Sequence, residues 1–267
     1  MKIGFLGAGK MAEAIASALV QAGLCDPWDV IACDTSTERR DLMAKQYAVA
    51  VTDCPSEAVK ACSVLVLGVK PQDLDALLAG VKQHLTAKHL LISIAAGKTL
   101  AALKKTAGTK PRIVRVMPNL ALVAEEGMSV YCAATNAKTA DKRLVTQMFG
   151  SAGAVLELPE KHFDAVTALS GSGPAFFAYV LNAMIEAATA LKLPKDAARL
   201  LAEQTLIGTG IYLQNTGRDI TEFIKAVASP KGTTAAGLAV LEQSSIKTIL
   251  AETLTAAAAR SAELRKA

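Results

Sequence analysis

The chain has 267 residues, a formal net charge of +5, 52% hydrophobic residues and only 4% aromatic residues. This length suits one large domain or two modest ones, and the many small apolar side chains favour closely packed helices. No block of like charges indicates a nucleic-acid arm, no C-x-x-C spacing occurs among the five cysteines, and the three histidines lie far apart. We therefore expect no nucleic-acid partner and no metal site.

The chain opens with a strand, a glycine turn and a helix. A short apolar run ends at Leu6, Gly7-Ala8-Gly9 breaks it, and apolar residues recur at helical spacing from Met11. This order is the context that the dinucleotide-binding fingerprint requires. Gly7 permits the tight turn, Gly9 lets a pyrophosphate approach the backbone, and Ala12 lets the helix lie close to the strand. The N–H groups at the helix start are expected to face the phosphates.

A second strand, over residues 29–33, ends at Asp34, the position that reads the adenine ribose. A carboxylate there accepts hydrogen bonds from the ribose hydroxyls and repels a 2′-phosphate, which favours NAD. Hydroxyl and guanidinium groups between Ser36 and Arg40 follow within one turn, and they can bind a 2′-phosphate if Asp34 turns away. These residues leave the choice of cofactor open. Ser36 or Thr37 is expected to cap the next helix.

Strands and helices continue to alternate. Further apolar runs predict strands over 63–69, 90–95, 113–117, 128–133 and 154–158, with helices over 74–85, 100–107 and 138–149. Uninterrupted apolar strands separated by helices indicate a parallel sheet covered on both faces, and the direction of the last strands stays open. Because ligands bind at the carboxyl ends of such strands, we expect cofactor contacts from Val69-Lys70-Pro71, Ala95-Ala96-Gly97 and Asn119.

From Phe163 onward the pattern is helical, with breaks near Pro194, Asp219 and residues 229–234. The predicted fold class is therefore α/β: a Rossmann-type doubly wound sheet followed by an all-helical domain. We predict a dinucleotide-binding domain over residues 1–160 and a helical domain over residues 161–267. The apolar run over 174–191 carries Asn182 and Glu186, so a buried helix explains it better than a membrane span.

The loop Ser229-Pro230-Lys231-Gly232-Thr233-Thr234 is the part of the helical half that is richest in chemistry. It places three hydroxyl groups, a cation and several backbone donors before a helix. Such a site can hold a carboxylate, and the alternative interpretation is an ordinary loop with a Ser or Thr cap.

Five motifs occur in order: Gly7-Ala8-Gly9-Lys10-Met11-Ala12, Val69-Lys70-Pro71, Met117-Pro118-Asn119, Leu169-Ser170-Gly171-Ser172-Gly173-Pro174 and Ser229-Pro230-Lys231-Gly232-Thr233-Thr234. Together they closely resemble the pyrroline-5-carboxylate reductase family, from Met1 to about Arg265. The resemblance implies reduction of 1-pyrroline-5-carboxylate to L-proline, the last step of proline biosynthesis. NADPH is the usual cofactor of the family and is expected here. Asp34 disfavours a 2′-phosphate, so NADH is also an expected cofactor.

The resemblance also implies a homodimer with interleaved helical domains, and such dimers often assemble into a decamer. The substrate of the family lies at the dimer interface, between the nicotinamide and the loop over 229–234. Backbone N–H groups, here of Gly232 and Thr233, bind its carboxylate, and Thr234 hydrogen-bonds its ring nitrogen. Glu160 matches an acidic residue near the substrate. Many members have Gly where this chain has Lys231, which either attracts the anionic substrate or points to water.

The expected site residues fall into two sets. Cofactor-binding residues are Leu6, Gly7, Ala8, Gly9, Lys10, Met11, Asp34, Ser36, Val69, Lys70, Pro71, Ala95, Ala96, Gly97 and Asn119. Substrate-binding residues are Glu160, Ser229, Lys231, Gly232, Thr233 and Thr234, with Thr234 as the catalytic residue.

Two other functions remain as alternatives. A two-domain reductase acting on a β-hydroxy acid, a keto acid or a different imine usually needs a lysine on a helix as acid and base. Lys192 and Lys195 flank the break at Leu193-Pro194 and fit that role poorly. A nucleotide-sensing protein without catalysis is the second alternative. No leader-like segment precedes Met1-Lys2-Ile3, so we expect a cytoplasmic protein with reduced thiols and no membrane association.

Overall fold

The computed structural model describes residues 1–266. They form two compact units. We call residues 1–172, with the C-terminal stretch that begins at Ala257, the sheet unit, and Gly173–Ala256 the helical unit. The compact units divide after Ser172, and the C-terminal stretch belongs to the sheet unit. The predicted domain boundary between residues 160 and 161 stays a prediction. Residue 267 of the predicted second domain lies outside the described residues.

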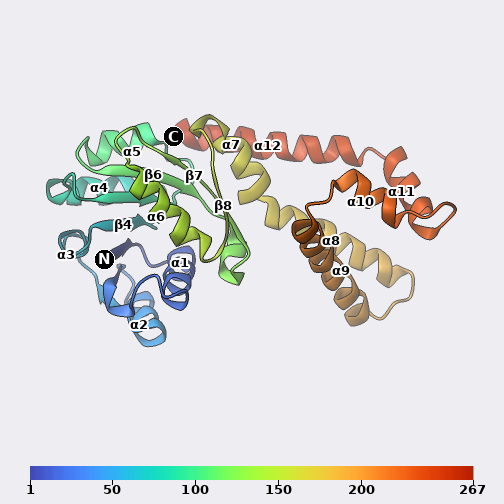
Figure 1. Cartoon of the computed structure of the whole chain (residues 1–267), viewed down its shortest axis with the longest axis horizontal. Coiled ribbons are helices and arrows are strands. Elements are labelled where there is room, and N and C mark those ends of the chain that lie inside the picture. Colours follow the sequence, from blue (N-terminus) through green and yellow to red (C-terminus); the bar gives the residue numbers. More distant parts are fainter. Residues whose placement is uncertain (267) are drawn as a thin grey trace. The chain divides into compact units, whose positions relative to one another are not determined.

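The sheet unit is built on one sheet (Figure 1). Its strands are β1 (Ile3–Leu6), β2 (Val30–Cys33), β3 (Ala50–Thr52), β4 (Val64–Leu67), β5 (Leu90–Ser93), β6 (Arg112–Met117), β7 (Gly127–Ala133) and β8 (Gly153–Glu157). They follow the order β3-β2-β1-β4-β5-β6-β7-β8, parallel through β6, while β7 runs antiparallel to β6 and parallel to β8. Through β6 this is the Rossmann order, which confirms the predicted fold class.

The register of the central strands brings three strand ends together. Leu6 at the end of β1 pairs with Cys33 of β2 and with Leu67 of β4. The residues that follow, Gly7, Asp34 and Gly68, therefore leave the sheet at one edge. The strand order reverses between β1 and β4, which is the point where doubly wound sheets bind their ligands.

Helices cover both faces of this sheet, as the sequence predicts. The buried apolar residues of α1 (Lys10–Gln21), α2 (Thr37–Tyr47) and α6 (Thr139–Gly150) belong to one core cluster, and those of α3 (Pro55–Ala61), α4 (Leu74–Val81) and α5 (Leu100–Ala107) to another. Successive strand residues alternate between the two cores, so that Val64 and Val66 face one and Leu65 and Leu67 the other.

Two elements of the sheet unit are absent from the sequence-based prediction, namely β3 and α3. Edge strand β3 has three residues, none of them buried, so it lacks the apolar run that marks the central strands. Helix α3 has seven residues and starts with Pro55. The predicted helix over 74–85 ends as an α-helix at Val81, and a 3₁₀ turn, Lys82–His84, completes it.

The C-terminal stretch is fastened to the sheet unit by polar contacts. It is the end of α12 (Ile246–Lys266). The Ser261 hydroxyl donates to the Asp164 carboxylate at 2.9 Å, and Arg265 pairs with the same carboxylate at 3.0 Å. Asp164 belongs to the short helix α7 (Phe163–Val166), which a π-helical turn, Thr167–Gly171, follows. The last helix therefore stabilises the region between β8 and α8.

The helical unit contains α8 (Gly173–Ala190), α9 (Lys195–Thr216), α10 (Ile220–Val227), α11 (Thr233–Gln243) and the first part of α12. Apolar residues of α8 are exposed in the single chain: Phe177 by 61%, Tyr179 by 79% and Met184 by 60%. Within the single chain α8 is therefore not buried, and its predicted burial stays a prediction.

One stretch of the described chain, Glu160–Ala190, is long and apolar enough to cross a membrane by length and composition, and only 11% of its most apolar window is buried. A single stretch of this kind is weak evidence for a membrane span, because helices that pack against other protein have the same composition.

Candidate functional site

Gly7 forms a turn that a larger residue could not adopt. Its φ is +97°, and a Cβ atom on it would lie 2.5 Å from the backbone nitrogen of Val69. Gly68 fits just as tightly, since a Cβ atom there would lie 2.8 Å from the Gly7 carbonyl oxygen and 3.2 Å from the Ala12 Cβ. The close approach predicted at Ala12 is confirmed. Sequence reasoning missed Gly68, although a glycine at the end of an apolar strand is a signal of close backbone approach.

Gly9 leaves open space above the start of α1. A Cβ atom on Gly9 would meet nothing within 4 Å. Gly9 is the N-cap of α1, and no side chain caps the N–H groups of this helix start. These donors lie at the positive end of the helix dipole. The residues present therefore fit the pyrophosphate of a dinucleotide.

Asp34 links the glycine turn to the start of α2. Its Oδ2 accepts the Ala8 N–H at 2.7 Å, and its Oδ1 accepts the Ser36 N–H at 2.9 Å. Ser36 is the N-cap of α2, as predicted, and its Oγ accepts the Arg39 N–H at 3.3 Å. The Asp34 carboxylate is thus held against the glycine turn, not turned away from it.

A cavity of about 310 Å³ lies at this edge of the sheet. It is lined by Leu6, Gly7, Gly9, Cys33, Asp34, Thr35, Asp53, Pro55, Gly68, Val69, Lys70, Asp73 and Leu77. The cavity therefore brings together predicted cofactor residues that follow β1, β2 and β4. Its volume falls within the range of small-molecule sites, which is about 300–1,000 Å³.

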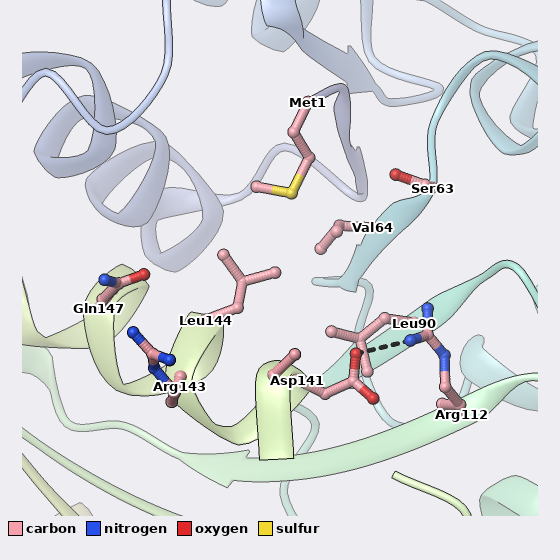
Figure 2. Close-up of a pocket in the computed structure, with 10 residues that line it drawn as sticks. Met1, Ser63, Val64, Leu90, Arg112, Asp141, Arg143, Leu144 and Gln147 are labelled. Carbon is pink, nitrogen blue, oxygen red and sulfur yellow. Dashed lines mark hydrogen bonds and ion pairs between the residues drawn. The ribbon is translucent and has the colours of Figure 1, made fainter. Parts of the chain in front are cut away.

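A larger cavity, of about 390 Å³, lies at the opposite edge, where β4, β5 and β6 begin (Figure 2). There Arg112 pairs with Asp141 at 2.8 Å and donates to the Lys88 carbonyl at 3.0 Å. The Arg112 Nε is buried and has no hydrogen-bond partner. We interpret the ion pair between Arg112 and Asp141 as structural. We place the candidate site in the cavity at the carboxyl ends of the strands, although that cavity has the smaller volume.

The remaining predicted cofactor residues follow β5 and β6. Gly97, in the turn after β5, has a φ of +75°, and a Cβ atom on it would lie 3.2 Å from the Leu264 carbonyl oxygen of α12. The Asn119 Oδ1 accepts the Met128 N–H at 3.1 Å, so a ligand contact from Asn119 would use its amide nitrogen. The predicted cofactor contacts of Ala95, Ala96, Gly97 and Asn119 stay predictions.

Glu160 is held by a buried cation. Its Oε1 accepts from Arg115 at 2.9 Å and from the Leu100 N–H at 2.8 Å. The Arg115 side chain is only 2% exposed, and its guanidinium lies 4.5 Å from the centre of the Phe163 ring. Sequence reasoning missed Arg115, which lies in an apolar strand and is matched to Glu160 only by the fold. This network gives Glu160 a positioning role, and its predicted substrate contact stays a prediction.

The loop over 229–234 has a strained lysine and an uncapped helix start. Lys231 has a φ of +60°, a left-handed conformation that glycine adopts more easily. Gly232 is the N-cap of α11, without a side-chain cap, and its own N–H donates to the Ser229 carbonyl at 3.0 Å. At this helix start the N–H groups of Thr233 and Thr234 face outward from the first turn, whereas that of Gly232 donates to Ser229. The predicted carboxylate contacts of Gly232 and Thr233 stay predictions.

Four of the five thiols are poor nucleophiles, because burial raises their pKa. All five cysteines are free. Burial raises the pKa of Cys33 and of Cys62 to about 11, and that of Cys132 to about 12. The hydrogen bond with Ser56 lowers the pKa of the Cys54 thiol. In the part of the chain that the structure describes, no cluster of His, Cys, Asp or Glu side chains could hold a metal ion.

Comparison with known proteins gives full-length matches. A family model described as pyrroline-5-carboxylate reductase dimerisation matches residues 160–264, and one described as NADP oxidoreductase, coenzyme F420-dependent, matches residues 2–97. The chain is 38% identical to a pyrroline-5-carboxylate reductase of Arabidopsis thaliana, over 98% of this chain and 95% of that protein.

Solved structures agree with the sequence relatives. A pyrroline-5-carboxylate reductase of Coxiella burnetii superimposes with a TM-score of 0.95 at 32% identity, covering 100% of this chain and 99% of the other. The Plasmodium falciparum pyrroline carboxylate reductase, solved with NADP bound, gives a TM-score of 0.88 at 29% identity, covering 99% of this chain and 98% of the other.

Proposed function

Because the chain belongs to the pyrroline-5-carboxylate reductase family, we propose that it reduces 1-pyrroline-5-carboxylate to L-proline with NAD(P)H, the last step of proline biosynthesis. The observation that carries the proposal is the uncapped start of α1 beside Gly7 and Gly9, in a chain that matches these reductases from end to end. A bound reduced nicotinamide supplies the hydride for this reaction.

In this proposal the sheet unit binds and orients the cofactor. The first-turn N–H groups of α1 hold the pyrophosphate, and Asp34 lies beside the adenine ribose. The turns after β4 and β5, with Lys70 and Gly97, complete the edge. Binding at a rigid sheet edge fixes the orientation of the reactive ring, and such positioning supplies much of the rate.

The helical unit contributes the loop over 229–234. The N–H groups at the start of α11 bind the substrate carboxylate, and no acidic residue in the first turn of α11 opposes an anion. Thr234, half-buried in that turn, holds and polarises the ring nitrogen. The motifs contain no histidine and no paired carboxylates, so the proton comes from solvent or is already on the imine.

The apolar faces of the helical unit fit a homodimer. The match to the dimerisation family covers this unit, and α8 exposes Phe177, Tyr179 and Met184. We extend the proposal to interleaved helical domains, further assembly into a decamer, and a cytoplasmic location.

The test is a steady-state assay of nicotinamide oxidation with 1-pyrroline-5-carboxylate or a keto acid, together with an assay of nicotinamide reduction in which a β-hydroxy acid is offered with the oxidised cofactor. Consumption of the reduced cofactor with the imine alone supports the proposal. Turnover of the keto acid would instead favour the related two-domain reductases, and no turnover with cofactor binding intact would favour a sensor. The position of Lys192 speaks against the rival reductases, since its φ of +74° places it in a turn and not within a helix.

A further inference from the structure

The edge beside the adenine ribose carries a fixed negative charge. Each carboxylate oxygen of Asp34 accepts a backbone N–H, from Ala8 at 2.7 Å and from Ser36 at 2.9 Å. Rotation of Asp34 would leave two N–H groups without an acceptor, which is costly for partly buried donors. Each oxygen keeps a further lone pair for a ribose hydroxyl. The carboxylate therefore stays where it can bind a ribose diol and repel a phosphate.

Arg39 is committed to the glycine turn. Its Nε donates to the Ala8 carbonyl at 2.7 Å, and its guanidinium pairs with Glu13. Glu13 also accepts the Tyr47 hydroxyl at 3.0 Å, so this pair lies within a network and not free in solvent. Recruitment of Arg39 to a phosphate would break the bond to Ala8 and leave the Glu13 carboxylate unpaired.

Arg40 wraps around the backbone that follows β2. Its guanidinium donates to the carbonyls of Asp34 at 2.7 Å and Thr35 at 3.0 Å, and to the Thr37 hydroxyl at 3.0 Å. It also lies 3.9 Å from the Asp53 carboxylate. The guanidinium groups of Arg39 and Arg40 are thus already engaged within the protein, and the Thr37 hydroxyl accepts one of these hydrogen bonds.

The charge of the cavity points in the same direction. Asp34, Asp53 and Asp73 line it, against a single lysine, Lys70. A cavity whose charged lining residues are mostly carboxylates disfavours a group that carries two further negative charges.

We infer that Asp34 determines cofactor specificity and that this chain binds NADH more tightly than NADPH. The inference rests on nucleotide binding by the sheet unit and deepens the proposed function. A carboxylate fixed beside a phosphate should weaken NADPH binding roughly tenfold relative to NADH binding. This ratio of dissociation constants corresponds to about 1.4 kcal/mol of binding free energy.

The test measures the dissociation constants of NADH and NADPH by fluorescence titration of the full-length protein, without an imine substrate, and then kcat/KM for both cofactors. Because the titration needs no turnover, it stays informative if the proposed reaction is wrong. Wild-type protein should bind NADH about tenfold more tightly. Asp34→Asn removes the charge but keeps an acceptor, and should bring the ratio of the two constants to about one or reverse it.

Asp73→Asn is the matched control, since it removes the same charge from the same cavity without touching the glycine turn. Its ratio should change by no more than about twofold, because Asp73 contributes only part of the general charge of the cavity, whereas Asp34 is fixed to the glycine turn by a hydrogen bond. Tighter wild-type binding of NADPH overturns the inference without any variant. An unchanged ratio of the two dissociation constants in a folded Asp34→Asn protein also overturns the inference. An equal change of this ratio in Asp34→Asn and Asp73→Asn overturns it as well. If Asp34→Asn does not fold, competition of wild type by 2′,5′-ADP against 5′-AMP decides the question, because these two compounds differ only in the 2′-phosphate: the inference requires that 5′-AMP compete better.

Discussion

The sheet unit and the helical unit bury their apolar residues to very different extents. Strands β1, β4 and β5 are buried along their whole length. In the helical unit, α8 and α9 bury only Gly173 and Ala198, and neither α10 nor α11 has a buried residue. The sheet unit closes its own core, whereas the helical unit presents surface that another protein surface must cover.

This difference separates two kinds of stability. In the sheet unit, stability comes from packing and ion pairs within one chain. In the helical unit it comes partly from association, so it depends on protein concentration. Variants in the two units should therefore fail in different ways.

The largest expected effect is on the apolar face of α8. Met184→Glu places a carboxylate where the partner's apolar surface should pack, and it should raise the dimer dissociation constant on the order of a thousandfold. The measurement is analytical ultracentrifugation over a concentration series. Trp28→Glu is the matched control, because Trp28 is 70% exposed in the sheet unit and should leave assembly unchanged. A Met184→Glu protein that remains dimeric would show that this face is not the interface.

In the sheet unit the largest effect should follow the loss of the Glu160 carboxylate. Glu160→Ala leaves the buried Arg115 guanidinium without its partner, and we expect a loss of about 3 kcal/mol in the free energy of unfolding, measured with urea. The comparison in the helical unit is Glu203→Ala, which removes an exposed pair with Arg199 and should not change stability measurably.

A kinetic measurement on Glu160→Gln separates positioning from substrate contact. The amide keeps an acceptor for the Leu100 N–H, so the protein should remain folded. If Glu160 touches the imine, KM for the substrate changes while the dissociation constant of the cofactor does not. If Glu160 only positions Arg115, both constants stay near their wild-type values.

These differences also explain what the sequence could predict. The glycine turn, the Ser36 cap and the strand ends at one edge depend on residues close in the chain, so local pattern was sufficient. The partner of Glu160 is Arg115, which lies 45 residues earlier, and nothing local connects them. The left-handed backbone of Lys231 and the use of the Gly232 N–H by Ser229 are likewise products of loop geometry and not of residue type.

A smaller effect is expected from Thr234 in the helical unit. Thr234→Ala removes the hydroxyl that we assign to the ring nitrogen, and kcat/KM for the imine should fall roughly 10–100-fold. The dissociation constant of NADH, measured by fluorescence, should stay within about twofold, because the cofactor residues belong to the sheet unit. Thr234→Ser should restore most of the activity. Full activity of Thr234→Ala would remove Thr234 from the mechanism.

The smallest expected effect is the gain in stability when a residue with left-handed backbone is replaced by glycine, and each unit offers one such residue. Lys231 has a φ of +60° and Ala48, at the end of α2, a φ of +54°. Glycine relieves the left-handed conformation, worth about 1–2 kcal/mol, but adds entropy to the unfolded chain. Each replacement, Lys231→Gly or Ala48→Gly, should therefore raise the free energy of unfolding by about 0.5–1 kcal/mol.

The two replacements should differ in kinetics. If the Lys231 ammonium attracts the anionic substrate, Lys231→Gly raises KM for the imine at low salt, and the difference from wild type disappears at high salt. Ala48→Gly changes no charge and lies outside the loop, so its KM should not depend on salt in this way. A KM for Lys231→Gly that equals that of wild type at every salt concentration would mean that the ammonium group points to water, and that the strain at residue 231 serves no purpose in substrate capture.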